Sequence, residues 1–413
     1  MGKINNMKPK TNAPHEVRIL PQIDKACGFD IHKDKIVLFI SDKEGKNQLL
    51  IEKTTFTEDL LWIRDLLLKE EVKNCVMEST GVYWLSLFDV LSQSGMNVVV
   101  VNPQQVKQIP KRKTDRRDAR WLCTLLLNGL VRPSFIASGI QRELRDLCRY
   151  RNKRIHEVNR IANWMVKELE KSNIKIRSVL SSITSKSGIS MVRLLAAGEK
   201  DVAKLKSVCH KRIRDKGELL DKALQGTLSE HGCKMLQMHL EDYDYVQCRI
   251  ELVNKQIEDL VNQHYSAVME PLQSISGIAS TAAQIIVSEI GDDMSRFPSA
   301  EHLTAWCGVA PGNNESADKR RNTGVKKGNK FLKTAMVGAA WAAVKMKNSY
   351  WRFLFEHLKK RMKAIKAIVV IARRLLKVVY KHIISKMQYA EKGWEQFAEL
   401  QRRNGLRKRP VVI

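Results

Sequence analysis

The order of apolar runs between residues 25 and 133 constrains the fold most strongly. Short β-branched stretches alternate there with stretches of helical periodicity, which is the pattern of an α/β domain. Three strand candidates come first, and two more then alternate with helices, the last of which begins near Thr114. The strand candidates are residues 26–30, 35–41, 48–55, 73–78 and 96–101. The sequence therefore predicts three strands followed by helix, strand, helix, strand and helix.

The chain changes character over residues 139–268, where prolines and strand signals are few and long helical stretches dominate. Apolar residues in the second long stretch step by four and three, as in a coiled coil. These residues are Val246, Ile250, Val253, Ile257 and Leu260. Two long antiparallel helices with a smaller helical insert between them are the simplest interpretation, and an ordinary helical bundle fits the pattern as well.

A mainly helical third region begins with PLQSISGIASTAAQIIVSEIGD, in which a turn at Gly277 separates two helices. This arrangement resembles a helix-hairpin-helix, whose turn presents backbone N–H groups to phosphates. Any two packed helices also need such a turn, so the motif is weak by itself. The predicted divisions of the chain are a polar leader at 1–24, an α/β domain at 25–138, a helical coiled-coil region at 139–270, a third domain at 271–350 and a basic helical tail at 351–413. The tail is expected only to pack and to contact a nucleic-acid backbone.

The balance of charge indicates a polyanionic partner. The formal net charge is +28, from 72 Lys and Arg against 44 Asp and Glu, which exceeds what solubility requires. The basic residues are spread along the chain instead of forming one amphipathic helix or juxtamembrane cluster, which favours nucleic acid over a membrane surface. The eight cysteines lack metal-ligand spacing, and no apolar run has the length of a signal peptide or a membrane span. A cytoplasmic protein with reduced thiols is expected.

Two carboxylates stand among cations in the stretch KRKTDRRDARW. Asp115 and Asp118 are three residues apart, so a helix beginning near Thr114 places them on one face. Two further acids end predicted strands, Asp30 in GFDIHKDK and Glu78 in VMESTG. The surrounding cations, which are expected to hold a nucleic-acid backbone, are Lys111, Arg112, Lys113, Arg116, Arg117 and Arg120.

Those four acids can meet at one edge of the sheet, because the strands that carry Asp30 and Glu78 are predicted to be central neighbours. Together they can hold two divalent cations for phosphoryl transfer, and Mg²⁺ in particular prefers carboxylate oxygen. Each acid also has a simpler interpretation. Asp30 can be a turn residue, Glu78 can favour a helix dipole, and Asp115 and Asp118 can form surface ion pairs. The simpler interpretations are favoured for each acid alone, whereas a metal site is favoured when the four acids are considered together.

The loop from Gly308 to Gly328 is rich in Gly, Asn and cations and contains one serine, Ser316. A serine nucleophile needs a base or metal to take its proton and cations to stabilise the transition state. No histidine is near enough in sequence to be that base, so a phosphate-binding loop in which Ser316 only donates a hydrogen bond remains the simpler alternative. The cations expected to contact phosphate here are Lys319, Arg320, Arg321, Lys326 and Lys327.

Four ordered motifs now carry a resemblance to a family: GFDIHKDK, MESTGVYW, KRKTDRRDARW and GVAPGNNESADKRRNTGVKKGNKFLKTAMVGAAW. In order and spacing they resemble the DEDD-type insertion-sequence transposases guided by a bridge RNA, the IS110 family. The long form of the last motif is most similar to the IS1111-like group. The resemblance covers roughly residues 25–350.

The resemblance implies a ribonuclease-H-like (RuvC-like) domain, a helical coiled-coil region and a C-terminal transposase domain. It makes Asp30, Glu78, Asp115 and Asp118 a tetrad for Mg²⁺, as two ions with Mn²⁺ as a substitute. It makes Ser316 the nucleophile of a transient covalent link to DNA. It also implies a structured noncoding RNA that pairs with donor and target DNA, and a dimer of dimers.

Three functions remain to be separated. The first is a recombinase that uses Ser316 with the tetrad. The second is a metal-dependent, junction-resolvase-like nuclease that uses the tetrad and a water, with Ser316 only binding phosphate. The third is a non-catalytic nucleic-acid-binding protein whose acids form surface pairs. A serine–DNA adduct distinguishes the first from the second, and dependence on a divalent metal distinguishes both from the third.

Overall fold

The computed structural model describes residues 23–106, 114–137, 139–312, 314–316, 319–322, 324–325, 327–391, 393–395, 397–399 and 402; for 104, 105, 314–316 and 319–322 it describes the backbone alone. The chain forms two compact units that divide between Ile136 and Ala137. The first is an α/β domain, and the second is mostly helical. This confirms the predicted class of both parts.

A five-stranded mixed sheet forms the centre of the N-terminal unit. The strands lie in the order β3-β2-β1-β4-β5. β2 pairs antiparallel with both β1 and β3, whereas β4 runs parallel to both β1 and β5. Their bounds are β1 Lys25–Ile31, β2 Ile36–Asp42, β3 Leu49–Lys53, β4 Asn74–Glu78 and β5 Asn97–Val101. All five predicted strands are present, and the strands that carry Asp30 and Glu78 are neighbours as predicted.

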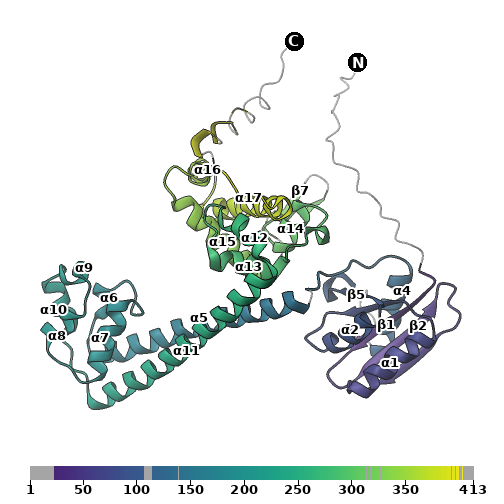
Figure 1. The fold of residues 1–413 in the computed structure, drawn as a ribbon, viewed down its shortest axis with the longest axis horizontal. Helices are drawn as coiled ribbons and strands as arrows, with labels where there is room; N and C mark the ends of the chain where they lie inside the picture. The colour runs from purple at the N-terminus through teal and green to yellow at the C-terminus, as the bar shows by residue number, and fades with distance from the viewer. Residues whose placement is uncertain are drawn as a thin grey trace, which may run out of the picture. The chain divides into compact units, whose positions relative to one another are not determined.

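Helices cover both faces of this sheet (Figure 1). α1 (Thr57–Lys69) and α2 (Trp84–Gln93) pack on one face, where alternate strand residues such as Phe29 and Met77 form an apolar core. α4 (Asp115–Leu127) packs on the opposite face, against Ala26 and Val76, and the short α3 (Pro103–Val106) adds Val106 to the same cluster. Because side chains alternate along a strand, every second residue of β1 and β4 is directed towards α4.

Gly28 lets α4 approach the sheet closely. A Cβ on this residue would lie 2.3 Å from the carbonyl oxygen of Ala119 and 2.5 Å from the amide nitrogen of Cys123. Both are backbone atoms of α4, so no side-chain rotation could relieve the overlap. The distance between β1 and α4 is therefore set by the absence of a side chain at this position.

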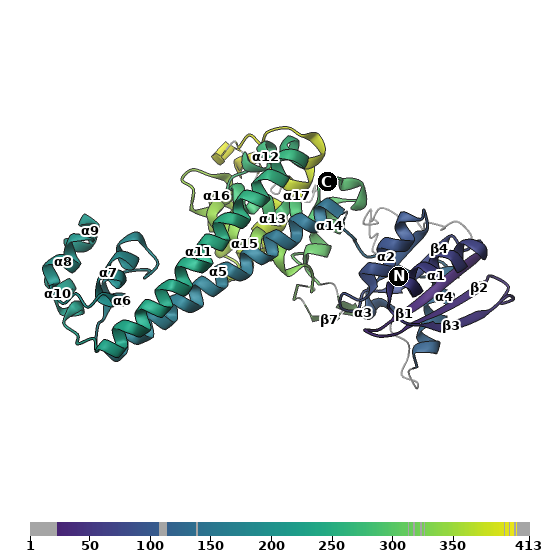
Figure 2. The same cartoon turned by 60° about the horizontal axis from the view of Figure 1, so that its bottom comes forward.

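Two long helices run side by side in the C-terminal unit, α5 (Gly139–Lys171) and α11 (Glu230–His264) (Figure 2). Arg151 of α5 donates to Asn254 of α11 at 3.1 Å, whereas Trp164, further along α5, stacks near His239. The residue number of the contacted residue on α11 falls as the residue number on α5 rises, so the two helices are antiparallel, as predicted. Of the predicted seam, Val246, Val253 and Ile257 are buried, while Ile250 and Leu260 are half-buried.

A small helical insert with its own apolar core lies between these two helices in sequence. Its helices are α6 Ile176–Val179, α7 Lys186–Ala196, α8 Val202–Ser207, α9 Lys211–Arg214 and α10 Glu218–Leu224. Met191, Leu205 and Leu220 form its centre, and Leu236 and Leu240 of α11 complete the cluster. The insert therefore packs against the long helices through one continuous core.

The remaining helices pack around α17. They are α12 Ser266–Gln273, α13 Ser280–Ile290, η1 Met294–Arg296, α14 Ala300–Cys307, α15 Lys330–Lys345, α16 Tyr350–Lys359 and α17 Ala364–Ser385. α17 contacts α12, α14, α15 and α16, and its residues Ile368, Ile371, Leu375 and Val379 are almost fully buried. This helix of the predicted tail is thus a core element, and the predicted domain boundaries stay predictions.

The turn at Gly277 joins α12 and α13 as predicted. Gly277 has φ +88°, and a Cβ there would lie 2.3 Å from the carbonyl oxygen of Ala339 and 2.7 Å from the amide nitrogen of Ala343, both in α15. The glycine therefore serves the packing of the turn against α15, and phosphate binding by this turn stays a prediction. No helix within the described ranges is both long and apolar enough to cross a bilayer.

We predict that Gly28→Ala destabilises the N-terminal unit by about 1–3 kcal/mol, the usual cost of an overpacked core. Hydrogen exchange of the β1 and α4 amides in the full chain measures this loss locally. Gly338→Ala is the matched control, since Gly338 lies inside α15 with open space around its Cα. There alanine should stabilise the helix by about 0.5–1 kcal/mol. Unchanged β1 protection in Gly28→Ala would contradict the close-contact argument.

Candidate functional site

Three titratable side chains converge on the α4 face of the sheet: Asp30, His32 and Asp115. The Nε2 atom of His32 lies 3.3 Å from Oδ2 of Asp30 and 3.5 Å from Oδ1 of Asp115. One ligand atom from each of the three lies within 4.8 Å of the other two. The structure therefore brings together two of the four predicted acids and adds a histidine that the sequence interpretation did not include.

The alternation of strand residues explains which acids share this face. Ala26 and Val76 pack against α4, so Gly28 and Asp30 on β1, and Glu78 on β4, are directed to the same side. β1 and β4 are parallel, with Phe29 opposite Met77. Asp30 and Glu78 follow these partners directly, at the same edge of the sheet.

Asp115 and Asp118 occupy the first turn of α4, where the helix dipole favours negative charge. Burial raises the pKa of Asp30 above its usual value, and the charges of Asp115 and Asp118 raise it further, while His32 opposes them. Asp118 therefore acts electrostatically on Asp30, although it is not one of the three converging groups. The carboxylate of Glu78 is also outside that group, and it accepts a hydrogen bond from the Thr80 hydroxyl.

Lysine and arginine side chains bind acids at this edge. The Nζ atom of Lys35 lies 2.6 Å from Oδ2 of Asp115, and this contact holds the pKa of Asp115 below its usual value. Arg116 pairs with Glu52 at 2.6 Å. Among the predicted nucleic-acid contacts of this stretch, Lys111, Arg112 and Lys113 lie outside the described residues, while Arg116 and Arg117 are exposed on α4.

The donor set fits a hard divalent cation. Carboxylate oxygens from two separate elements meet at one place, and burial is the main cause that raises the pKa of Asp30. Carboxylate oxygen also suits Mn²⁺, whereas imidazole nitrogen, here from His32, is a common ligand for transition metals such as zinc and iron. Asp30 and Asp115, with Asp118 and Glu78 on the same face, are thus the residues that could hold metal.

The predicted serine loop contains a short β-hairpin. β6 (Asn314–Ser316) pairs antiparallel with β7 (Lys319–Asn322), and Ser316 lies opposite Lys319. Arg320 and Arg321 belong to β7, Lys327 is exposed beyond it, and Lys326 lies outside the described residues. Ser316 is therefore the last residue of its strand, in the pair next to the turn.

The base of this hairpin is closed by backbone contacts. Pro311 forms an isolated bridge with Val325, and the Gly312 amide donates to the Gly324 carbonyl at 2.9 Å. A Cβ on Gly328 would lie 2.4 Å from the amide nitrogen of Gly308, which ends α14. The two stems of the loop thus meet at Gly308 and Gly328.

Asn329 connects this base to a buried acid, Glu289 of α13. The Asn329 side chain accepts hydrogen bonds from the amides of Phe331 and Leu332, which caps α15, and donates to Oε2 of Glu289 at 2.6 Å. Glu289 is 1% exposed. The carboxylate therefore fixes the start of α15, and with it one stem of the hairpin, to α13.

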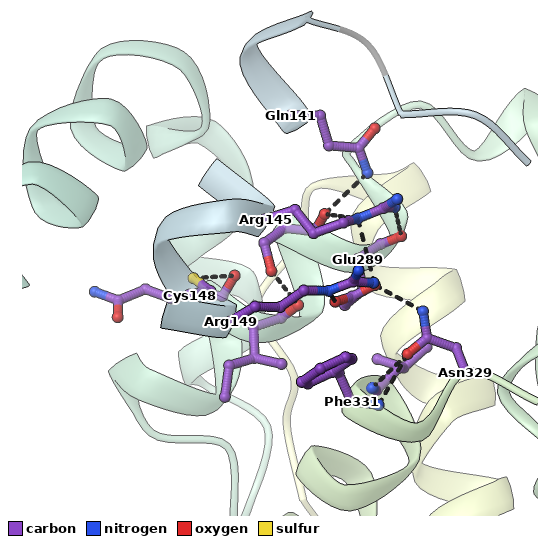
Figure 3. A network of polar contacts seen from close by, with 11 residues as sticks. Gln141, Arg145, Cys148, Arg149, Glu289, Asn329 and Phe331 are labelled. Atoms are coloured by element: carbon purple, nitrogen blue, oxygen red, sulfur yellow. Dashed lines mark hydrogen bonds and ion pairs between the residues drawn. The ribbon is translucent and has the colours of Figure 1, made fainter. Parts of the chain in front are cut away.

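Two arginines of α5 neutralise Glu289 (Figure 3). Arg149 binds both carboxylate oxygens at 2.9 Å, and its guanidinium stacks over the Phe331 ring at 4.5 Å. Arg145 lies 3.4 Å from Oε2 and also donates to the carbonyl oxygens of Ser288 and Glu289, at 3.2 and 2.8 Å. The network consequently links α5, α13 and α15 through one buried charge.

Sequence reasoning did not identify His32, Lys35 or Glu289. A signal existed for His32, which follows Asp30 by two residues and so falls on the same side of an extended chain. Lys35 lies in the turn between β1 and β2, directly before Ile36. Glu289 gave no local signal, because its arginine partners lie 140 and 144 residues earlier in the chain.

Comparisons with known families match both units. Residues 27–174 match a family described as a transposase, of the DEDD IS110 type, and this match contains the three converging groups. Residues 269–355 match the family described as transposase IS116/IS110/IS902, which contains Glu289 and the serine hairpin. Together the two matches cover more than half of the chain. No curated protein matches the sequence.

We predict that Glu289→Gln lowers the free energy of unfolding of the C-terminal unit by about 1–3 kcal/mol, because two partly buried guanidinium groups lose their counter-charge. Hydrogen exchange should accelerate at the amides of Phe331 and Leu332. Glu356→Gln is the matched control: Glu356 pairs with Lys359 on the surface of α16, so its loss should cost no more than about 0.5 kcal/mol. Equal stability of the two variants would refute the anchoring role of Glu289.

Proposed function

The chain is a DNA transposase with the two domains of the IS110 family, and we propose that it moves an insertion sequence through a transient phosphoserine at Ser316. The observation that carries this proposal is the position of Ser316 next to the turn of a basic hairpin, opposite Lys319. A nucleophile in such a position can reach a phosphodiester while neighbouring cations hold the same backbone.

In the proposed reaction the Oγ atom of Ser316 attacks a backbone phosphorus. The new Oγ–P bond forms as the P–O3′ bond breaks, and the serine proton is transferred overall to the departing 3′ oxygen. The 3′ hydroxyl of another strand then attacks the phosphoserine, which restores the serine hydroxyl and joins the strands. Lys319, Arg320, Arg321, Lys326 and Lys327 bind the phosphates around the attacked bond.

Asp30, Glu78, Asp115 and Asp118 would hold divalent metal, with Mg²⁺ as the physiological ion, two ions as the full complement and Mn²⁺ as a substitute. When bound, such metal supplies positive charge that stabilises the attacking and leaving oxygens of phosphoryl transfer. The Nε2 atom of His32 lies 3.3 Å from Asp30 and 3.5 Å from Asp115, where it would help to orient both carboxylates. Lys111, Arg112, Lys113, Arg116 and Arg117 bind nucleic-acid backbone next to these acids.

The strand order β3-β2-β1-β4-β5, with three antiparallel strands followed by two parallel ones, supports assignment of the N-terminal domain to the ribonuclease-H-like fold. The antiparallel pair of α5 and α11 supports a coiled-coil region. We further propose a structured bridge RNA that pairs with donor and target DNA, assembly as a dimer of dimers, membership of the IS1111-like group and action in the cytoplasm. Sequencing of RNA that copurifies with the protein tests the guide.

We predict that Ser316→Ala abolishes the covalent protein–DNA adduct and reduces strand exchange by at least about a hundredfold. The adduct is measured by denaturing electrophoresis after incubation with nicked DNA. Ser207→Ala, a substitution of an exposed serine in the insert, is the control and should form adduct normally. Metal-dependent cleavage without any adduct in the native protein would instead favour the nuclease alternative, in which water is the nucleophile.

We also predict that Asp30→Asn reduces DNA cleavage by about a hundredfold or more, since loss of a metal-binding carboxylate removes several kcal/mol of transition-state stabilisation. The affinity of the variant for DNA should differ from that of the native protein by less than about threefold. Asp34→Asn, which removes an exposed acid from the same turn, is the matched control and should retain cleavage. Chelation of divalent metal should abolish cleavage and added Mg²⁺ should restore it; cleavage that persists in chelator would refute metal use.

A further inference from the structure

A groove of about 460 Å³ lies between α5, α13 and α15. Its polar lining comes mainly from α5 and from the start of α15, and it includes Arg149, Asn152, Lys153, His156 and Lys330. The ring of Phe331 and the side chain of Ile285 form its apolar part. None of the cationic residues predicted from sequence to bind nucleic acid belongs to this set.

The charge of the groove is positive because its acid is already neutralised. Glu289 is the acid of the lining, and its carboxylate is bound on both oxygens by Arg149. Lys153 and Lys330 are exposed, and neither is paired with an acid in the part of the chain that the structure describes. Lys153 and Lys330 thus line one groove without an acid partner among the described residues, and the ammonium group of Lys330 lies 5.2 Å from the centroid of the Phe331 ring.

The place of the groove relates it to the serine hairpin. Lys330 follows Asn329, the residue that fixes the hairpin base to Glu289. Phe331, whose ring Arg149 covers, lies in the groove wall and is half-buried. Arg149, Glu289 and Phe331 therefore belong both to the network that anchors the hairpin (Figure 3) and to the lining of the groove.

We propose that this groove binds the phosphodiester backbone of a nucleic-acid strand, with Lys153 and Lys330 contacting its phosphates. Ammonium groups suit this ligand because they attract phosphate regardless of base sequence. The site deepens the proposed function, on which it rests, since it adds a strand-binding surface at the base of the hairpin that carries Ser316. It holds backbone next to the hairpin, whereas the hairpin performs the chemistry.

The binding test compares two double variants of equal charge. Lys153→Gln with Lys330→Gln removes the groove ammonium groups, and Lys255→Gln with Lys347→Gln removes two exposed lysines elsewhere in the same unit. Binding of the full chain to labelled single-stranded DNA, duplex DNA and RNA of one sequence is measured by fluorescence anisotropy over a range of salt. The groove variant should bind about fivefold to fiftyfold more weakly than the control. The slope of its log affinity against log salt concentration should be shallower by about 1–2.

The three probes identify the source of the phosphates. Weakened binding confined to DNA assigns the groove to a DNA strand, weakened binding confined to RNA assigns it to RNA, and weakening of all three assigns it to backbone in general. Each of these results supports the groove. Equal affinities of the groove and control variants for every probe would overturn it.

A second measurement uses the native chain and so does not depend on the folding of a variant. Acetylation of lysines in the presence of nucleic acid, read by mass spectrometry, should show at least about fivefold protection of Lys153 and Lys330 relative to Lys255. Ser316→Ala should show the same protection. If Lys153 and Lys330 are protected but no serine–DNA adduct forms, only the role of Ser316 as nucleophile is rejected. If the adduct forms but the two lysines are not protected, only the groove is rejected.

Discussion

The backbone contact between β1 and α4 at Gly28 is the constraint on which the carboxylate cluster depends. Asp30 lies two residues after this glycine and is directed to the same face, whereas Asp115 and Asp118 lie in the first turn of the helix that the glycine admits. A larger residue at position 28 would overlap the backbone of α4, so the helix could not keep its present distance from β1. The chemistry of the cluster thus rests on a residue that has no functional group. An acid pair from distant segments needs a fixed distance between those segments, and direct contact of two backbones provides it without adjustable side chains.

A different interaction organises the C-terminal unit. Glu289 is a single buried carboxylate, yet it joins three helices, because Arg145 and Arg149 reach it from α5 and Asn329 from the start of α15. Both carboxylate oxygens of Glu289 accept hydrogen bonds from these side chains, and the side-chain amide of Asn329 also caps α15. Arg151, two residues after Arg149 and buried, has no acid partner in the described structure; its Nη1 atom donates to Asn254 and Gln284, while its buried Nη2 atom has no hydrogen-bond partner there. The junction of α5, α11 and α13 is therefore polar inside, which specifies one arrangement of the helices more strictly than apolar packing would.

Features encoded by local patterns could be predicted, and features formed by distant partners could not. The five strands follow from alternating apolar runs, and the convergence of Asp30 and Asp115 follows from strand order. The hairpin around Ser316 lacked a strand signal because its strands are short and rich in polar and charged residues. α17 was assigned to a basic tail, although Ile368, Ile371, Leu375 and Val379 repeat at helical spacing; its many cations obscured that stripe. Glu289 was hidden because nothing near it in sequence distinguishes a buried ion pair from an exposed acid at a helix end.

Lys35 gives the carboxylate cluster an internal counter-ion. Its ammonium group lies 2.6 Å from Asp115 and comes from the same turn as His32. The ammonium contacts only Oδ2 of Asp115, whereas Oδ1 lies beside His32, so a metal that bound Asp115 through Oδ2 would exchange one cation for another. The affinity for metal then includes the free energy of the lost ion pair, which limits how tightly metal can be held. A lysine displaced in this way would stay attached beside the carboxylates and would keep its positive charge there.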